Sequence, residues 1–157
     1  MSLEGTAEIN FRSYTVKQVH FHAKSEHTIN GQHYPLEGHF VHKAQDGSTA
    51  VIGVMFKEGA ENKSFQQILD AATADAAGEV NVTIDSLDLS LLFPPKLNYY
   101  HYLGSLTTPP LTENVEWYVL KDPVEISHEQ LNDFYKYYDN NNRETQQLNG
   151  RQVFEFE

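Results

Sequence analysis

Apolar and polar residues alternate with a period of two along much of the chain, which is typical of β-strands. Residues 14–23 alternate in this way, and residues 36–42 do so again after the turn signal Asn30-Gly31. We expect these two segments to be antiparallel neighbours in one sheet. One face of the first segment should carry Tyr14, Val16, Gln18, His20 and His22. One face of the second should carry Glu37, His39 and Val41.

Residues 49–57 are apolar on both faces, so we expect a central, buried strand there. Further strands are predicted at residues 80–84, 99–103, 115–120 and 152–156. Two capping-box patterns predict helices, one starting at Ser64 with Gln67 and one starting at Ser127 with Gln130. The pattern predicts a single domain over residues 1–157, mostly β with minor α, around a central, largely antiparallel twisted sheet.

Composition narrows the classes of function that fit this domain. The chain of 157 residues has 11 basic and 22 acidic residues, a net charge of -11. Such a charge repels phosphate backbones and anionic lipids, so we expect neither nucleic acid nor a membrane as a partner. Cysteine is absent, which excludes disulfides and thiolate ligands. Residues 1–5 show no signal-peptide pattern, and we expect them to be an added start.

Histidine clustering is the strongest chemical signal. Six of the eight histidines lie between His20 and His42. His20 and His22 are two apart on a predicted strand, so both rings leave the same face, and His39 lies on the predicted partner strand. Three neutral imidazoles suit Zn²⁺ and leave a fourth position for water. Histidines paired on a strand also occur as surface or hydrogen-bonded core residues, and that interpretation stays open.

Glu37 and Gln18 each lie two residues before one of these histidines, on the same predicted face. A histidine that binds zinc usually donates its other N–H to a carboxylate, amide or carbonyl. A carboxylate on an inward face is costly without a partner, so a ligand histidine would explain Glu37. The alternative is a solvent-facing strand position.

Four separated motifs complete a recognisable order. They are Gln-Val-His-Phe-His at 18–22, Ser-Glu-His-Thr at 25–28, Glu-Gly-His-Phe-Val-His at 37–42 and Gly-Ser-Leu-Thr-Thr-Pro-Pro at 104–110. This order resembles the α-class carbonic anhydrases, especially bacterial members, and residues 115–121 and 146–151 also resemble that family. The resemblance runs from about residue 7 to the C-terminus.

The resemblance implies zinc held by His20, His22 and His39, and hydration of CO₂ to bicarbonate and a proton by a zinc-bound hydroxide. Thr107 would donate its hydroxyl proton to Glu26 and so accept from that hydroxide. Residues that support the ligands and this network would be Gln18, Glu37, His27 and Tyr102. The apolar pocket for CO₂ would be formed by Val41, Val51, Leu106, Thr108, Val115 and Trp117. No residue is assigned as proton shuttle, and the histidines expected to be solvated are His33, His42, His101 and His128.

The family normally has several dozen more residues before the point where this chain starts, so we expect a truncated sheet that lacks its N-terminal strands. An unpaired edge would favour association with a second copy. Bacterial members are usually exported, which implies a periplasmic or secreted protein. The alternative is a catalytically weak or inactive relative that binds zinc or a partner, although the inactive relatives typically lose a ligand histidine and this chain keeps three. A metal-free structural domain is the third possibility. A different zinc hydrolase is not favoured, because the sequence contains no His-Glu-x-x-His run.

Overall fold

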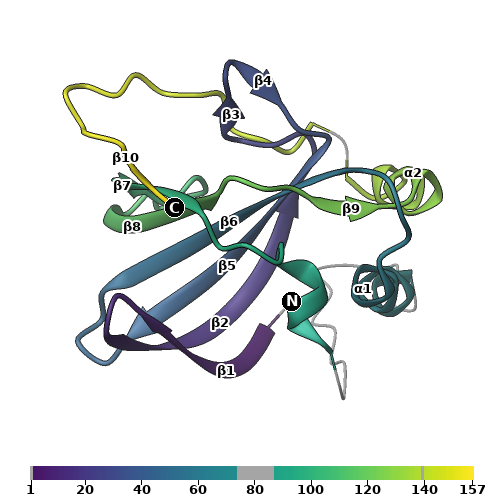
Figure 1. The fold of residues 1–157 in the computed structure, drawn as a ribbon, viewed down its shortest axis with the longest axis horizontal. Helices are drawn as coiled ribbons and strands as arrows, with labels where there is room; N and C mark the ends of the chain where they lie inside the picture. The colour runs from purple at the N-terminus through teal and green to yellow at the C-terminus, as the bar shows by residue number, and fades with distance from the viewer. Residues whose placement is uncertain (1, 74–86, 139) are drawn as a thin grey trace.

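A computed structural model describes residues 2–73, 87–138 and 140–157. One mixed sheet of eight strands runs through the molecule in the order β1-β2-β5-β6-β8-β7-β10, with β9 paired to β6 (Figure 1). The strands of this sheet are β1 (Ser2–Ile9), β2 (Arg12–His22), β5 (Leu36–Ala44), β6 (Thr49–Glu58), β7 (Tyr99–Ser105), β8 (Glu113–Leu120), β9 (Val124–Ile126) and β10 (Phe154–Phe156). The remaining elements are β3 (Thr28–Ile29), β4 (Gln32–His33), α1 (Lys63–Thr73), the 3₁₀ helix η1 (Leu89–Leu92) and α2 (His128–Tyr135).

The predicted mostly β fold is confirmed, with one adjustment to the sheet. β6 pairs in parallel with both β8 and β9, while the other pairings are antiparallel. The predicted central strand at 49–57 is β6, which is buried along most of its length. The last predicted strand begins at Phe154 rather than at residue 152. The predicted strand at 80–84 lies outside the described residues.

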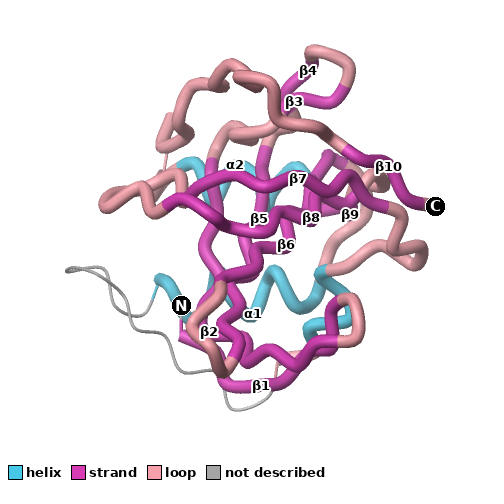
Figure 2. The backbone as a smooth tube through the Cα atoms, turned by 90° about the vertical axis from the view of Figure 1, so that its left-hand side faces the viewer, coloured by secondary structure: helices cyan, strands magenta, loops and turns pink. Residues whose placement is uncertain are grey.

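The chain begins with a strand, because Ser2–Ile9 forms β1 and pairs with β2. A two-residue turn at Asn10 and Phe11 joins these strands, with φ of 49° and 60°. Asn30 and Gly31, at φ of 52° and 76°, form the predicted turn, but it closes the small β3–β4 hairpin rather than joining the two long strands directly. This hairpin and the chain leading into β10 lie together at the upper end of the molecule (Figure 2).

A bulge in β2 corrects the predicted face of two residues. Val16 is paired with His42 and Gln18 with Val41, so Lys17 is the extra residue. Tyr14 and Val16 therefore share the face of Val19 and Phe40, not the face of the histidines. The sequence prediction was wrong here because alternation alone does not reveal an inserted residue.

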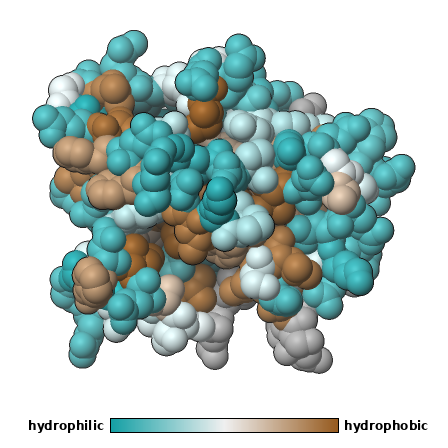
Figure 3. All heavy atoms as spheres, viewed as in Figure 1, coloured by the Kyte–Doolittle hydropathy of each residue, from teal (hydrophilic) through white to brown (hydrophobic). Residues whose placement is uncertain are grey.

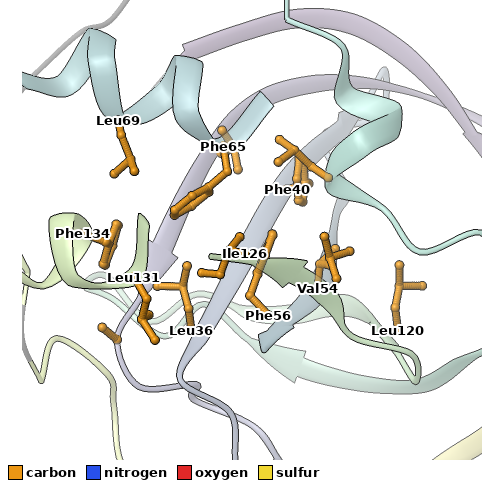
Figure 4. Close-up of a cluster of buried hydrophobic side chains, with 14 residues drawn as sticks. Leu36, Phe40, Val54, Phe56, Phe65, Leu69, Leu120, Ile126, Leu131 and Phe134 are labelled. Carbon is orange, nitrogen blue, oxygen red and sulfur yellow. The ribbon is translucent and has the colours of Figure 1, made fainter. Parts of the chain in front are cut away.

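The two helices cover this Val19–Phe40 face of the sheet. Phe65 and Leu69 of α1 and Leu131 and Phe134 of α2 belong to one buried cluster with residues of the sheet (Figure 4). Its labelled members from the strands are Leu36, Phe40, Val54, Phe56, Leu120 and Ile126. Each such side chain contributes about 1.5–3 kcal/mol through burial. No helix of the described residues covers the histidine face, which leaves that face available for chemistry.

The helix starts were predicted with mixed success. The capping box of Ser127 and Gln130 is present at the start of α2, as predicted. The prediction that Ser64 caps the first helix was wrong. Asn62 caps α1, because its Oδ1 accepts a hydrogen bond from the N–H of Phe65 at 3.0 Å. Ser64 instead donates its hydroxyl to the carbonyl of Asp88. Among the described residues, neither helix has the length and apolar character needed to cross a membrane.

Candidate metal centre

Three histidines converge on the helix-free face of the sheet, as their spacing predicted. His20 of β2 lies directly opposite His39 of β5, and His22 follows on the same face. Ring centroids are separated by 5.0 Å for His20 and His22, 5.2 Å for His20 and His39, and 4.6 Å for His22 and His39. One potential ligand atom from each ring lies within 4.8 Å of the others. The antiparallel register of β2 and β5 thus assembles the cluster.

Each of these rings has a nitrogen that is free for a metal ion. Nδ1 of His20 and Nε2 of His22 are buried without a hydrogen-bond partner among the described residues. His39 uses Nε2 to contact Glu37 at 3.0 Å, which leaves its Nδ1 turned toward the cluster. Burial, with repulsion from His39 and His22, lowers the pKa of His20 to about 3. Burial also lowers the pKa of His22. The neutral imidazoles that a metal requires are therefore the favoured forms at neutral pH.

Glu37 is the centre of the hydrogen-bond network behind the cluster. Its Oε2 accepts the backbone N–H groups of Glu26 and His27 at 2.8 and 2.9 Å, and its Oε1 contacts Nδ1 of His27 at 2.7 Å. Burial alone would raise the pKa of Glu37, but His27 and His39 hold it well below the ordinary value. The neighbouring position 53 must be glycine, because a Cβ on Gly53 would lie 2.9 Å from Oε1 of Glu37. Glu37, His27 and His39 could also surround a metal, but their mutual hydrogen bonds already explain their proximity.

The supporting residues differ in how far the structure follows the prediction. Nε2 of His27 lies 2.7 Å from the hydroxyl of Tyr102, so His27 links Tyr102 to Glu37. Burial raises the pKa of Tyr102, which keeps it protonated. Gln18 is exposed, and Nδ1 of His20 has no hydrogen-bond partner in the part of the chain that the structure describes. The predicted hydrogen bond between Gln18 and His20 is therefore not formed.

Glu26 and Thr107 line one cavity of about 590 Å³, together with His27 and Tyr102. Oε1 of Glu26 accepts the backbone N–H of Arg143 at 2.7 Å. Oε2 of Glu26 is buried and has no hydrogen-bond partner among the described residues. The predicted bond from the Thr107 hydroxyl is therefore not formed in this structure, although the acceptor for it is free.

The predicted apolar pocket is largely one cluster beneath the histidines. Val41, Val51, Val115 and Trp117 are buried in it, and Leu106 packs against it. The Trp117 ring lies 4.8 Å from that of His39, and its Nε1 donates to the carbonyl of Ser105 at 2.9 Å. Thr108 is exposed and lies outside this cluster. A turn after β7 carries Thr108 away from the sheet, with the N–H of Leu111 donating to the Thr108 carbonyl.

The four unassigned histidines do not all face solvent as expected. His33 and His128 are exposed. His42 is 4% exposed, with Nδ1 2.7 Å from the carbonyl of Phe40. His101 is half-buried, stacked on Tyr118 and 2.5 Å from Glu116. The expectation was wrong for His42, because β5 is buried on both faces.

Two residues of the site were missed by the sequence analysis. The backbone carbonyl of Asn141 lies 3.1 Å from Nδ1 of His22, and Arg143 contacts Glu26 as described above. Both lie more than a hundred residues from their partners along the chain. No local pattern could indicate such contacts, since backbone groups make them and any residue type supplies those groups.

Comparison with known proteins accounts for this geometry. A family model described as eukaryotic-type carbonic anhydrase matches residues 2–157. The chain belongs to this family. A carbonic anhydrase of Pectobacterium atrosepticum is 44% identical over 156 residues, which cover 96% of this chain and 62% of that protein. The predicted resemblance to carbonic anhydrases is confirmed. The chain spans about 60% of the length of the curated carbonic anhydrases that it matches.

Solved structures of the carbonic anhydrase fold agree with the sheet described above. The α-carbonic anhydrase of Thermovibrio ammonificans, solved with the inhibitor sulfanilamide, is 45% identical with a TM-score of 0.84. The match covers 92% of this chain and 64% of that one. Dioscorin, solved with ascorbate, is 31% identical with a TM-score of 0.82, covering 98% of this chain and 66% of its own.

Proposed function

We propose that this chain catalyses the reversible hydration of CO₂ to bicarbonate and a proton, with zinc held by His20, His22 and His39. The observation that carries the proposal is the set of three converging imidazoles, each with a nitrogen free of protein hydrogen bonds. Membership of the carbonic anhydrase family supports the same reaction. The donor set of three histidines suits Zn²⁺ with one open position.

Zinc bound there would supply Lewis-acid activation of water at neutral pH. The residues of the chain determine how the ion is held. The carbonyl of Asn141 and the carboxylate of Glu37 contact the second nitrogens of His22 and His39. These contacts fix the ring orientation and leave the opposite nitrogen for the metal.

Glu26 and Thr107 would orient the reacting water. Arg143 occupies Oε1 of Glu26, and Oε2 remains available for one donor. A hydroxyl has one proton, so a Thr107 that donates to Oε2 can only accept from the water. This arrangement would select one orientation of the reacting oxygen. The wall formed by Val41, Val51, Leu106, Val115 and Trp117 would receive the apolar substrate, with Thr108 at its exposed rim.

Stopped-flow measurement of CO₂ hydration on zinc-loaded protein tests the proposal. We expect activity that disappears on chelation, returns with zinc and falls with an aromatic sulfonamide. A matched His39→Ala protein should be inert. Zinc-dependent activity retained by that variant would contradict the assignment of the ligands.

A second candidate function is a catalytically weak or inactive relative that uses the same fold for binding. It is favoured by the missing hydrogen bond between Thr107 and Glu26 and by the exposed Gln18. Stoichiometric zinc binding at the triad without CO₂ hydration would support this candidate over the enzyme. Absence of zinc in protein purified under metal-replete conditions would leave a metal-free domain.

We also propose that the protein is of bacterial type and exported to the periplasm or secreted, as its family resemblance implies.

We further propose that a second copy of the chain covers the edges of the sheet at β1 and β10. Apolar residues gather in patches over the middle of one face (Figure 3), and Phe154 and Phe156 of β10 are 50% and 43% exposed. Size-exclusion chromatography with light scattering tests this association, and a stable monomer that unfolds cooperatively would refute it.

A further inference from the structure

The cavity beside Glu26 and Thr107 is larger than the proposed reaction requires. Its volume of about 590 Å³ lies within the range of roughly 300–1,000 Å³ that is typical of pockets for drug-sized ligands, and CO₂ and bicarbonate are far smaller. The rest of its lining comes from β7, β8, the β3–β4 hairpin and the chain between α2 and β10. The hairpin and this chain lie together above β7 and β8 (Figure 1). The hydration of CO₂ gives these parts of the lining no role.

One part of this lining is apolar. Tyr100 of β7 and Val119 of β8 are register partners and form its sheet side. Ile29 of β3 lines the same cavity, as do Leu148 and Val153 of the chain that leads into β10. Such a lining favours an aromatic or aliphatic group, because binding removes the apolar area of both from water.

The same cavity collects positive charge. The chain has three arginines, and two of them, Arg143 and Arg151, line the cavity. The third, Arg12, pairs with Asp46 on the surface. Among the described residues, the side chains of Arg143 and Arg151 form no ion pair, although the chain has twice as many acidic as basic residues. A guanidinium without a carboxylate partner suits an anionic ligand.

Two carboxylates share the lining and leave this charge unpaired. Glu26 uses Oε1 for the backbone N–H of Arg143, not for its guanidinium. Glu144 is exposed to solvent. Both would repel an anion, so the charge of a ligand alone is not enough for binding. A ligand must also place an apolar group against the lining.

The guanidinium of Arg151 is fixed by the turn that precedes it. Its Nε donates to the carbonyl of Leu148 at 2.8 Å, and its Nη2 donates to the carbonyl of Gln147 at 2.7 Å. A guanidinium has more N–H donors than these two bonds use, so others remain for a ligand. Because the group is already held, an anion that binds it costs little side-chain freedom.

We propose that this cavity binds a small organic carboxylate, with its anionic group against Arg151 and its aromatic or aliphatic part against Tyr100 and Val119. Arg143 adds a second positive charge. Pairs of arginine with a carboxylate are frequently bidentate, which fixes the orientation of the ligand. Binding of this kind needs neither zinc nor CO₂, so the inference does not rest on the proposed function.

Titration of the metal-free protein with benzoate, followed by ¹H–¹⁵N NMR, tests the proposal. Benzoate joins a ring to a carboxylate, and the absence of zinc excludes direct binding of that carboxylate to the metal. We expect saturable binding in the millimolar range, with shifted amide signals for Tyr100, Val119 and Arg151. Benzamide has a similar shape without the charge and should bind about tenfold more weakly.

Arg151→Gln should weaken benzoate binding by about tenfold, because the ion pair is lost. The matched control is Arg12→Gln, the same substitution at the arginine outside the cavity, and its Kd should stay within about twofold of the parent. A thermal melt checks that Arg151→Gln folds without its bonds to the turn. If it does not fold, Arg143→Gln carries the measurement, with a smaller loss expected.

Equal benzoate affinity in the parent and in the folded arginine variant of the cavity would overturn the proposal. Equal affinity of the parent for benzoate and benzamide would do the same, and so would the absence of saturable binding. Failure of the proposed function gives a different result. A protein that binds benzoate through Arg151 but does not hydrate CO₂ removes the function and supports this inference.

Discussion

The site has two halves that differ in how the chain builds them. The ligand half comes from β2 and β5, within twenty residues of sequence. Its rings are held by strand pairing, by Glu37 and by the carbonyl of Asn141. The orienting half comes from the loop after β7 and from Arg143, far along the chain. In the ligand half, the second nitrogens of His22 and His39 make hydrogen bonds to the protein. In the orienting half, the hydroxyl of Thr107 makes no hydrogen bond to Glu26.

The difference shows what strand register can and cannot provide. The pairing of β2 with β5 places His20 directly opposite His39. The strand hydrogen bonds that form the sheet therefore also position these two ligands. Thr107 instead lies in a turn that closes on itself, through bonds from Leu106 to Thr112 and from Leu111 to Thr108. Metal binding should therefore depend mainly on the sheet, with one distant contact from the carbonyl of Asn141, and turnover on the distant Thr107 and Arg143.

The largest expected effect breaks the ligand half. His39→Ala removes one of three ligands, so zinc affinity should fall by more than the roughly 100-fold that loss of a supporting group costs. Competition with a chelator measures this affinity. The Glu37 network also loses a partner, which makes some loss of stability an expected second effect.

His128→Ala is the matched control for this variant. His128 is exposed at the start of α2 and contacts Glu58 at 3.1 Å, away from the cluster. Its zinc affinity should equal that of the parent. Equal losses in the two variants would show that the triad is not the principal zinc site.

The next effect breaks the orienting half alone. Arg143→Pro deletes the N–H that binds Oε1 of Glu26, while Arg143→Ala keeps it. A hydrogen bond to a buried charged group contributes about 1.5–3 kcal/mol. We expect Arg143→Pro to lower kcat/KM by about tenfold or more, with zinc affinity nearly unchanged.

Arg143→Ala serves as the control, and its kcat/KM should stay within about twofold of the parent. A thermal melt of both variants checks that they fold. Equal activity in the proline and alanine variants would mean that the N–H of Arg143 does not position Glu26. The two halves of the site would then not divide as described.

This division also explains what the sequence could reveal. The triad and Glu37 were predictable because a period of two places residues on a face, and the register then brings the faces together. The bulge at Lys17 escaped prediction because it inverts the alternation within one strand. Asn141 and Arg143 escaped because their backbone groups make the contacts with His22 and Glu26. The capping role of Asn62 escaped because Ser64 offered an equally good pattern two residues later.

A smaller effect concerns the pH dependence of stability. Burial lowers the pKa of His42, so the folded state holds it neutral while the unfolded chain takes up a proton below about pH 6.5. Stability from this group is complete above that pH and is lost as the pH falls. The free energy of unfolding can be measured with urea on metal-free protein at about pH 8 and about pH 5.5. Between these two values, His42→Gln should lose about 1 kcal/mol less of this free energy than the parent.

The triad provides the background for that comparison. His20 and His22 also have lowered pKa values and destabilise the metal-free parent and variant alike at low pH. Their contribution cancels in the difference. Identical pH dependence in parent and His42→Gln would mean that His42 is protonated as readily in the folded chain as in the unfolded one.

The smallest effect concerns the turn that precedes β2, at the opposite end of this strand from His20 and His22. Phe11 is fully exposed at φ 60° in the β1–β2 turn, a backbone region that favours glycine over any residue with a Cβ. Phe11→Gly should relieve about 1 kcal/mol of strain and raise the melting temperature by about 2–4 °C. Phe11→Ala keeps the Cβ and should give no comparable gain. Zinc affinity should be unchanged in both, because the bulge at Lys17 separates this turn from His20 and His22. A change in affinity would show that the ligand half depends on the whole of β2 and not only on its pairing with β5.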